Sequence, residues 1–499
     1  MSIKKLAGQT LWYGLPSIAT RFIGYILNFS LIFIYQAVDT ADLTQIYAIF
    51  PFLNILFTYG VETSYFRFAQ QHDRKKLFNT LNISLLITTI LFSICLWAFQ
   101  SSLVSLTAMQ DHPEYLQWMI GIIFFDTMST LAFAKLRQEE RPRKYAFVKL
   151  LGIIINVSIV LWFIGVCPNI NKSNPKSFLL LGYDESIGIG YYLIGNMVGS
   201  IITFLMLLSV FKGFKFEFDK VLWKEVMKYS MPLIVVGLGG MINDMLSRLV
   251  FQHVTNLPMH EAKHQLGIFA ANYRLAVLIT IFIQMFRLAA EPFFFNKSKD
   301  KNAPETYANV MNYFVIACAF MFLFIGLYLD VFKTIMSLKY KSYGEGIHIV
   351  PILALGGVFL GIYYNLSIWY KLTNRNWYGA GITIAGAIVT IVLNILWIPK
   401  YGYTGSAWAT FCCYLFMMIS SYFLGQKYYP IPYNIRKIGF YLILMIVVTL
   451  ISFFLNPYIN SLGLRFLLST ALFAVFIVTS IVLDKQSYVQ LPVVGKLFK

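Results

Sequence analysis

Charged side chains lie inside several long apolar stretches of this 499-residue chain. The clearest case is Arg21, which lies about twelve residues into the apolar stretch 10–35, or about 18 Å along a helix that starts at residue 10. Arg248, Arg274 and Lys149 lie in other apolar stretches. A guanidinium group is always charged, and its planar fork matches phosphate oxygens. These residues predict a cavity that binds a phosphate-bearing polyanion.

Four carboxylates accompany the basic residues: Glu62, Asp126, Asp244 and Glu291. They would keep an empty cavity hydrated and are candidates for binding a proton or a sodium ion during a transport cycle. The sequence leaves open whether they do so or whether the cycle needs no coupling ion.

Local pairing offers a simpler explanation for some of these residues. Lys149 can extend its amine toward the cytoplasmic surface, and Arg248 can pair with Asp244 one turn away. Glu291 can pair with Arg287 at a spacing of four. Arg21, Arg274 and Asp126 have no such neighbour. A buried arginine costs at least about 2.5 to 3.5 kcal/mol in a membrane, so Arg21 should face a partner or water.

The composition places these residues in a membrane. Hydrophobic residues make up 58% of the chain and charged residues 12%, whereas a soluble domain needs roughly 25% charged residues. The five cysteines show no metal-ligand spacing, and neither a metal site nor a cofactor is expected. The excess of basic residues lies between apolar stretches, which favours cytoplasmic loops over a nucleic-acid partner.

Fourteen apolar stretches are long enough to cross a bilayer. With both termini in the cytoplasm, the connections on that side hold 28 of the 40 Lys and Arg residues and the outer connections hold eight. Basic residues concentrate in cytoplasmic loops, so this split supports the orientation. The fourteen stretches are 10–35, 43–66, 78–99, 115–134, 145–166, 187–211, 229–251, 266–289, 306–329, 347–370, 377–399, 404–425, 438–456 and 464–483.

The first and seventh stretches match when the chain is shifted by 216 positions, which places Pro16 on Pro232 and Gly24 on Gly240. The prediction is an all-α membrane protein of two pseudo-symmetric six-helix lobes plus two C-terminal helices. Parallel repeats of this kind are related by an axis along the membrane normal and place substrate at their interface. The predicted parts are an N-terminal lobe at 1–211, a cytoplasmic linker at 212–228, a C-terminal lobe at 229–426, and two helices with a cytoplasmic tail at 427–499.

The linker 212–228 alternates lysines with Phe214, Phe216 and Phe218. This pattern is typical of a segment that lies on anionic lipid headgroups, and a plain solvated linker is an equal alternative. In the sixth stretch, Gly195 and Gly199 form a GxxxG pattern, which favours close helix contact.

Three segments carry a family resemblance. They are Asn394-Ile-Leu-Trp-Ile-Pro399-Lys-Tyr401-Gly402, Tyr343-Gly-Glu-Gly-Ile-His-Ile-Val-Pro351 and Ala290-Glu291-Pro292-Phe293. With them the chain resembles the polysaccharide flippases of the Wzx type, within the superfamily that includes the multidrug and toxin extruders. The resemblance covers nearly the whole chain, is strongest at about 340–430, and marks the fold more than the substrate.

The resemblance implies a fourteen-helix exporter in the inner (cytoplasmic) membrane of a bacterium, not an enzyme. Its implied substrate is an undecaprenyl-pyrophosphate-linked oligosaccharide of O-antigen, capsule or exopolysaccharide, moved to the outer leaflet by alternating access. Arg21 best fits the family's basic cavity residue on the first span. The implied partners are this glycan, membrane lipids and polysaccharide polymerase or chain-length machinery.

Three alternatives stay open. A cation-coupled drug or toxin extruder would share the fold but have an acidic pocket. A flippase for a lipid-linked peptidoglycan precursor is a close variant. A membrane polymerase or ligase would need a large outer loop, and the longest one here, at about 167–186, has only around twenty residues.

Overall fold

The computed structural model describes residues 16, 19–107, 109–298, 300–373 and 375–489. The side chains of a few residues within helices, Glu291 among them, lie outside that description. The described part is helical and contains no strand, so the predicted all-α class is confirmed. Contact density divides the chain into two compact units, Met1–Met241 and Ile242–Lys499, with the boundary inside one long helix.

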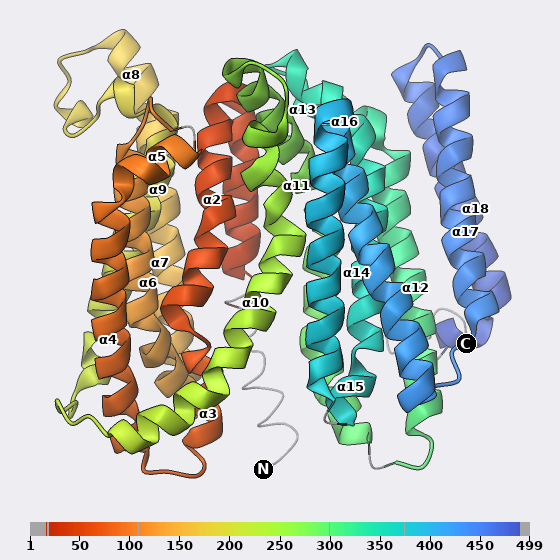
Figure 1. Ribbon diagram of the computed structural model, residues 1–499. Helices are drawn as coiled ribbons and strands as arrows, with labels where there is room; N and C mark the ends of the chain where they lie inside the picture. The colour runs from red at the N-terminus through yellow and green to blue at the C-terminus, as the bar shows by residue number, and fades with distance from the viewer. Residues whose placement is uncertain (1–15, 17–18, 108, 299, 374, 490–499) are drawn as a thin grey trace. The chain divides into compact units, whose positions relative to one another are not determined.

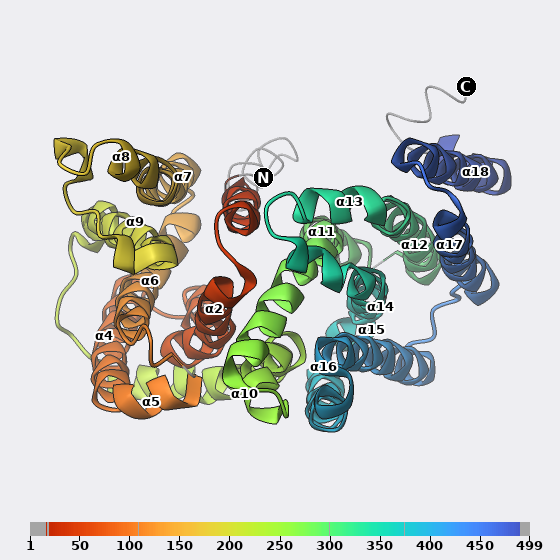
Figure 2. The ribbon, with the colours of Figure 1, turned by 90° about the horizontal axis from the view of Figure 1, so that it is seen from above.

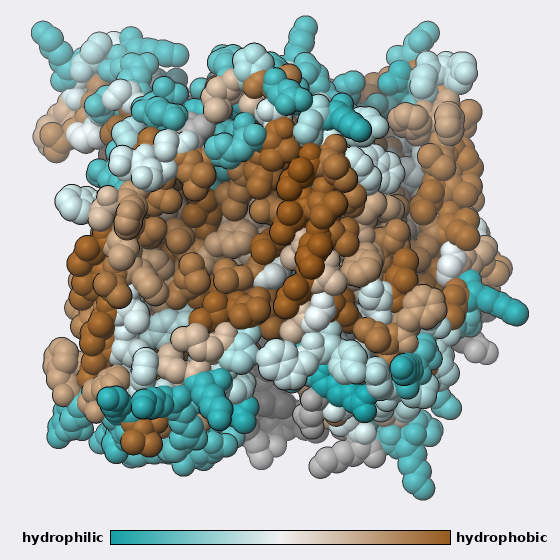
Figure 3. Space-filling view, viewed as in Figure 1, coloured by the Kyte–Doolittle hydropathy of each residue, from teal (hydrophilic) through white to brown (hydrophobic). Residues whose placement is uncertain are grey.

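Twelve helices of the described part are long and apolar enough to cross a membrane. A shorter apolar helix, Ala19–Phe33, covers the described part of the first predicted span. The eleventh and twelfth predicted spans both lie in the helical segment α16 (Asn376–Tyr428), on either side of a non-helical kink at Gly402. The count of fourteen therefore stays a prediction. On the face in view in Figure 3, apolar residues cover the middle of the helices and polar residues gather at their ends.

The first unit is built around α6 (Glu114–Gln138), which packs against α2, α4 and α9 (Figure 1). α7 packs against α9 and continues into a short π-helix, Leu161–Val166. The other helices of this unit are α2 (Ala37–Thr58), α3 (Val61–Phe68), α4 (Arg74–Ala98), α5 (Gln100–Thr107), α7 (Pro142–Val160), α8 (Cys167–Ser173), α9 (Tyr191–Leu207) and the first part of α10 (Lys220–Val254).

Close contact between α7 and α9 depends on the predicted GxxxG pattern. A Cβ on Gly199 would lie 2.9 Å from the carbonyl oxygen of Gly152, and a Cβ on Gly195 would lie 2.9 Å from the amide oxygen of Asn156. No larger side chain fits without a shift, so the prediction from the pattern is confirmed.

The second predicted span is broken, which the sequence analysis missed. α2 ends at Tyr59 and α3 begins after Gly60, both with positive φ values of 33° and 69°. A Cβ on Gly60 would lie 3.2 Å from Leu233 of α10. The break separates α3 from α2 at this end of the unit.

The second unit is built around α14 (Val350–Leu366), which packs against α11, α12 and α16, and Figure 2 shows it among them. α17 and α18 pack on α12 at the edge of this unit. The remaining helices are α11 (Met259–Lys297), α12 (Ala303–Leu327), α13 (Leu329–Met336), the 3-10 segment Lys341–Ile349, α15 (Ile368–Leu372), α17 (Ile435–Leu455) and α18 (Leu462–Val489).

A sharp bend divides α16 at Gly402, whose φ and ψ are 55° and −138°. Pro399 precedes the bend, and Gly405 follows it so closely that a Cβ there would lie 2.6 Å from the carbonyl oxygen of Trp397. The Pro, Tyr-Gly and small-residue pattern quoted above thus folds as a turn between two antiparallel halves of one helical segment.

The linker 212–228 is part of the first unit. Its buried side chains Leu222, Val226 and Met227 join a core cluster with residues of α3, α4 and α6. It is therefore a docked segment and not a freely solvated one. The predicted lobe boundaries are not tested by this division and stay a prediction.

Candidate functional site

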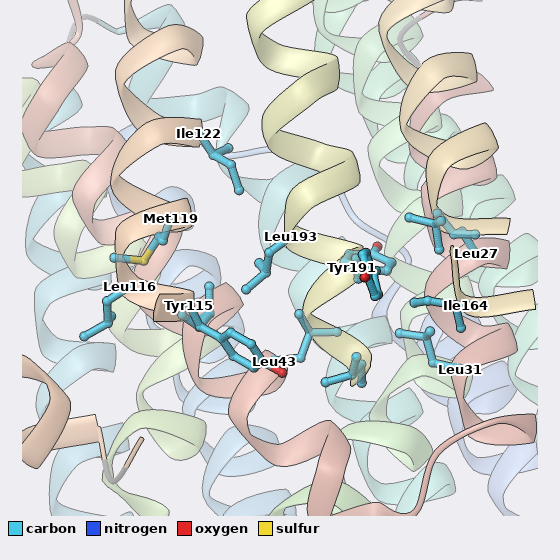
Figure 4. Packing of buried hydrophobic residues seen from close by; sticks show 14 of the residues in the cluster. Leu27, Leu31, Leu43, Tyr115, Leu116, Met119, Ile122, Ile164, Tyr191 and Leu193 are labelled. Carbon is cyan, nitrogen blue, oxygen red and sulfur yellow. The ribbon is translucent and has the colours of Figure 1, made fainter. Parts of the chain in front are cut away.

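The helix that carries Arg21 is fixed to the first unit by its apolar side chains. Leu27 and Leu31 are 4% and 0% exposed, and they belong to a core cluster with Ile164 and Tyr191 (Figure 4). Arg21 lies on the same helix, six residues before Leu27, and its side chain is exposed. The core thus anchors one part of the helix while the guanidinium stays accessible.

Asp126 lies where four helices of the first unit meet. It accepts a hydrogen bond from the Ser200 hydroxyl of α9 and interacts with the charge of Lys149 on α7. The Lys149 amine lies 4.3 Å from the centre of the Phe133 ring. Lys149 is therefore turned to an aromatic ring and to the Asp126 charge, and the interaction links two residues that the sequence analysis placed in different roles.

Tyrosines extend the polar region around Asp126. Asn196 of α9 donates a hydrogen bond of 2.7 Å to the Tyr47 hydroxyl of α2. The Tyr47 ring packs edge-on against Tyr192, with 5.7 Å between the ring centres, and Asn28 donates to the Tyr192 hydroxyl at 3.4 Å. Tyr47 also interacts with the Asp126 charge. A carboxylate among hydroxyl and amide groups can exchange a proton or hold a small cation.

Glu62 lies apart from this region, at the start of α3. It forms an ion pair with Arg137 of α6, and both side chains are partly exposed. The Arg137 guanidinium also lies 5.0 Å from the centre of the Phe66 ring. The contact gives Glu62 a structural partner, while its predicted coupling role stays a prediction.

In the second unit, Asp244 and Arg248 both contact Tyr273 of α11. The Tyr273 hydroxyl donates to an Asp244 carboxylate oxygen at 2.7 Å. The Arg248 guanidinium carbon lies 4.1 Å from the centre of the Tyr273 ring, and Arg248 is only 8% exposed. Asp244 and Arg248 are thus held by a shared aromatic residue. Arg274 follows Tyr273 on α11 and is half-buried.

A second basic position in this unit comes from Arg287 of α11. Its guanidinium carbon lies 4.8 Å from the centre of the Tyr364 ring of α14, and Tyr364 also interacts with the Asp244 charge. Arg287 and Lys371 line one pocket with the buried Asn365. Within the described part of the chain, the Asn365 amide oxygen has no hydrogen-bond partner. The pocket offers two cations to an anion.

Arg287 and Lys371 lie at the ends of the predicted spans 266–289 and 347–370, so the sequence analysis counted them among the 28 basic residues of the cytoplasmic side. α11 instead continues to Lys297, so Arg287 is a helical residue three turns from its end. Tyr273 and Tyr364 were missed because a tyrosine in an apolar stretch carries no signal of its own among 32 tyrosines. Glu291 lies in α11, but its side chain is outside the described residues.

No metal cluster supplements these groups: among the described residues, no set of three His, Cys, Asp or Glu side chains could hold a metal ion. The polar groups described above in each unit are arginine, lysine, carboxylate and tyrosine side chains, together with serine and asparagine in the first unit and asparagine in the second. Such groups can bind an anion, and the carboxylates can take up a proton.

Solved membrane transporters share this fold. The lipid II flippase MurJ in an inward closed conformation is similar with a TM-score of 0.71 and 15% identity, over 95% of this chain and 99% of that one. An inward-facing multidrug resistance MATE family transporter of the MOP superfamily gives a TM-score of 0.62 and 13% identity, over 84% and 94%. A Vibrio cholerae MATE transporter, VcmN, gives 0.53 and 10%, over 88% and 99%. No curated protein matches the chain. At 10–15% identity these likenesses show the fold, which is that of multi-helix membrane transporters and flippases.

The family model for polysaccharide biosynthesis proteins matches residues 6–298, more than half of the chain. The chain belongs to this family, so the family named from the sequence is confirmed. Of the three quoted segments, 290–293 lies within the matched residues, and 343–351 and 394–402 lie beyond them. It is a multi-pass membrane protein.

Proposed function

We propose that this protein moves a polyprenyl-pyrophosphate-linked oligosaccharide from the cytoplasmic to the outer leaflet of a bacterial cytoplasmic membrane. The oligosaccharide would be a repeat unit of O-antigen, capsule or exopolysaccharide. Family membership supports a role in polysaccharide biosynthesis, and the fold supports transport across a bilayer. Polysaccharide polymerase or chain-length machinery would act on the delivered unit.

The observation that carries the proposal is the basic character of the polar groups within the spanning helices and at their ends. In the second unit, Arg248 is buried against Tyr273, and Arg287 and Lys371 share a pocket. A diphosphate needs such partners, because each buried anionic oxygen must be hydrogen-bonded or paired. A site for organic cations would instead need unpaired carboxylates. The polyprenyl tail would stay in the lipid while the head group crosses between the alternating states.

The driving force has two candidates. A pyrophosphate diester carries about two negative charges, and its outward movement toward a positive exterior gains about 2.3 kcal/mol per charge per 100 mV. Proton or sodium coupling is the other candidate, and the hydrogen-bonded Asp126 is the carboxylate best placed for it. In reconstituted vesicles, a membrane potential imposed without an ion gradient should suffice for transport in the first case. In the second case, a proton or sodium gradient imposed at zero potential should drive transport.

Arg21 provides the first test. Arg21→Ala is expected to reduce delivery of the lipid-linked glycan to the outer leaflet at least tenfold. Arg21→Lys should retain part of the activity, because lysine keeps the charge but not the planar fork. The measurement is the amount of glycan that becomes accessible to a lectin on the periplasmic face of intact cells, at matched protein levels. Wild-type delivery in both variants would remove Arg21 from the mechanism.

A drug or toxin extruder is the second candidate, favoured by the likeness to MATE structures. It predicts that expression of the chain raises resistance to cationic compounds and that Asp126→Asn abolishes this resistance. Unchanged susceptibility in a strain that lacks its own extruders would argue against it. The likeness to a lipid II flippase keeps a peptidoglycan precursor as a related substrate, which growth rescue of a strain depleted of its own precursor flippase would reveal.

A further inference from the structure

The linker 212–228, which lies within the first unit, is held against α4 by three hydrogen bonds. The Lys215 amide donates to the Asn79 side chain at 3.3 Å, and the Asp219 amide donates to the Thr80 hydroxyl at 3.2 Å. The Trp223 indole donates to the Ser84 hydroxyl at 2.8 Å. The segment therefore has a fixed position along a membrane-spanning helix.

These contacts set the depth of the linker. Asn79 and Ser84 lie five and ten residues after Arg74, the first residue of α4. At 1.5 Å per residue they lie about 8 and 15 Å along the helix axis. The headgroup layer of one leaflet is roughly 5 to 8 Å thick. With the charged first turn of α4 (Arg74, Lys75 and Lys76) in the headgroup layer, a linker at this height would run along the boundary between headgroups and acyl chains.

The outward side of the linker is apolar at this height. Phe216, Phe218 and Val221 are 79%, 46% and 78% exposed, whereas the neighbouring Leu222 is 5% exposed and packed into the core. Exposed aromatic and aliphatic side chains on one face, with the other face docked, are typical of a segment that lies in a membrane interface.

Lysine side chains surround these apolar side chains, and the acidic residues of the segment are paired with basic side chains. Lys212, Lys215, Lys220 and Lys224 are exposed, and the Lys144 amine interacts with the charges of Arg141 and Lys212. The acidic residues of the segment have partners: Lys76 lies 2.7 Å from Asp219, Lys215 lies 3.7 Å from Glu217, and His72 lies 3.4 Å from Glu225.

The docking contact at Asp219 persists at neutral pH. Hydrogen bonds from Lys76 and from the Leu222 and Val221 amides hold the pKa of the Asp219 carboxyl below its usual range. Its contribution to docking is present above the ordinary carboxyl pKa and is lost as the pH falls through the lowered value. The Asp219 charge is thus paired with Lys76 of α4 and not with a lysine of the linker, whereas Lys215 is paired with Glu217.

We propose that residues 212–221 form a binding surface for anionic phospholipid headgroups of the cytoplasmic leaflet. The lysines contact the lipid phosphates, and Phe216, Phe218 and Val221 enter the acyl boundary. Phosphatidylglycerol is the simplest lipid of this chemistry. The surface is a feature of the first unit and does not depend on which substrate the protein carries.

The test compares full-length protein with a triple variant, Lys212→Gln/Lys215→Gln/Lys220→Gln, and an apolar variant, Phe216→Ser/Val221→Ser. The matched control is Lys172→Gln/Lys176→Gln/Lys400→Gln, which removes the same charge from exposed lysines of the predicted outer connections. Native mass spectrometry titrations with phosphatidylglycerol give the apparent affinity. Hydrogen exchange of residues 212–221 is followed in nanodiscs of phosphatidylcholine with and without phosphatidylglycerol.

The triple variant is expected to bind phosphatidylglycerol at least about tenfold more weakly, because each lysine at an anionic surface contributes roughly fivefold. The control should bind like the wild type, and amides 212–221 of the wild type should be more protected when phosphatidylglycerol is present. Equal affinity of the triple variant and the wild type would overturn the proposal. Equal protection in the two lipid mixtures would also overturn it, because the surface would then not discriminate between anionic and neutral headgroups.

A third outcome separates the lipid from the transported substrate. If the triple variant keeps its phosphatidylglycerol affinity but loses binding of a soluble sugar diphosphate, the lysines serve the substrate and the lipid assignment is wrong. An unchanged melting temperature of each variant shows that the docked side of the linker is intact. Failure of the flippase proposal leaves these lipid measurements unaffected.

Discussion

Arg248→Ala is expected to lower delivery of the lipid-linked glycan about 30- to 1000-fold. Arg248 is 8% exposed and packs on Tyr273, which in turn donates to Asp244. Removing one member of a buried charge cluster costs about 2 to 4 kcal/mol, since the remaining Asp244 charge loses a neighbouring cation. The assay is lectin accessibility of the glycan on cells with equal amounts of membrane-inserted protein.

Two further variants serve as controls for the Arg248→Ala result. Arg248→Lys should retain intermediate activity, because lysine keeps the charge and loses the planar stacking on the tyrosine. Lys301→Gln, an exposed lysine of the same unit, should behave like the wild type. Arg248→Ala protein that delivers glycan normally would exclude the Asp244–Tyr273–Arg248 cluster from transport.

Gly402→Ala is expected to lower the stability of the second unit by about 2 to 4 kcal/mol. The backbone at Gly402 has φ 55° and ψ −138°, a conformation that only glycine adopts without strain of about 1 to 3 kcal/mol. The added Cβ would also lie 2.8 Å from the side-chain oxygen of Gln265. Thermal unfolding of detergent-purified protein, followed by a thiol-reactive dye, measures the effect.

Gly381→Ala is the matched control, because it lies in the same helix with open space around its Cβ position. It should be neutral or slightly stabilising, as alanine favours helix. An equal melting temperature of Gly402→Ala and wild type would show that the bend tolerates a side chain. Backbone strain at this turn would then not explain why residue 402 is a glycine.

Hydropathy was sufficient to predict the helical fold. A membrane-spanning helix needs about 20 apolar residues, and most of this chain lies in apolar stretches of that length. Local motifs were also informative where a backbone constraint demands a residue type. Gly199 allows α9 to approach Gly152, and Gly402 allows the bend of α16. A Cβ on Gly346, which lies in the family segment 343–351, would clash with the Asn272 side chain of α11. The glycine at this position therefore allows close packing against α11.

The sequence could not predict how the helices face one another. Apolar stretches set helix length, but rotation about each axis depends on packing between residues far apart in the chain. The contact of Tyr273 with Arg248, and that of Arg287 with Tyr364, follow from this packing. The same limit applied to Asp126 and Lys149, which were both named from the sequence but not as neighbours.

The span boundaries failed where polar residues continue a helix or glycine interrupts one. α11 extends to Lys297 beyond its predicted end at 289, because the residues after Arg287 keep helical geometry. The break at Tyr59 and Gly60 lies inside a stretch of high hydropathy, so no polarity signal marks it. The linker 212–228 combines charged and aromatic residues in its sequence. Neither pattern predicts that the linker docks on α4.

Reconstituted transport tests the central claim most directly. Purified protein is placed in liposomes that hold a polyprenyl-pyrophosphate-linked oligosaccharide in one leaflet, and a glycosidase outside reports the glycan that crosses. We predict protein-dependent crossing that inorganic pyrophosphate slows and that Arg248→Ala abolishes. The assignment would be contradicted if the glycan remained in its original leaflet while the same protein moved organic cations across the membrane.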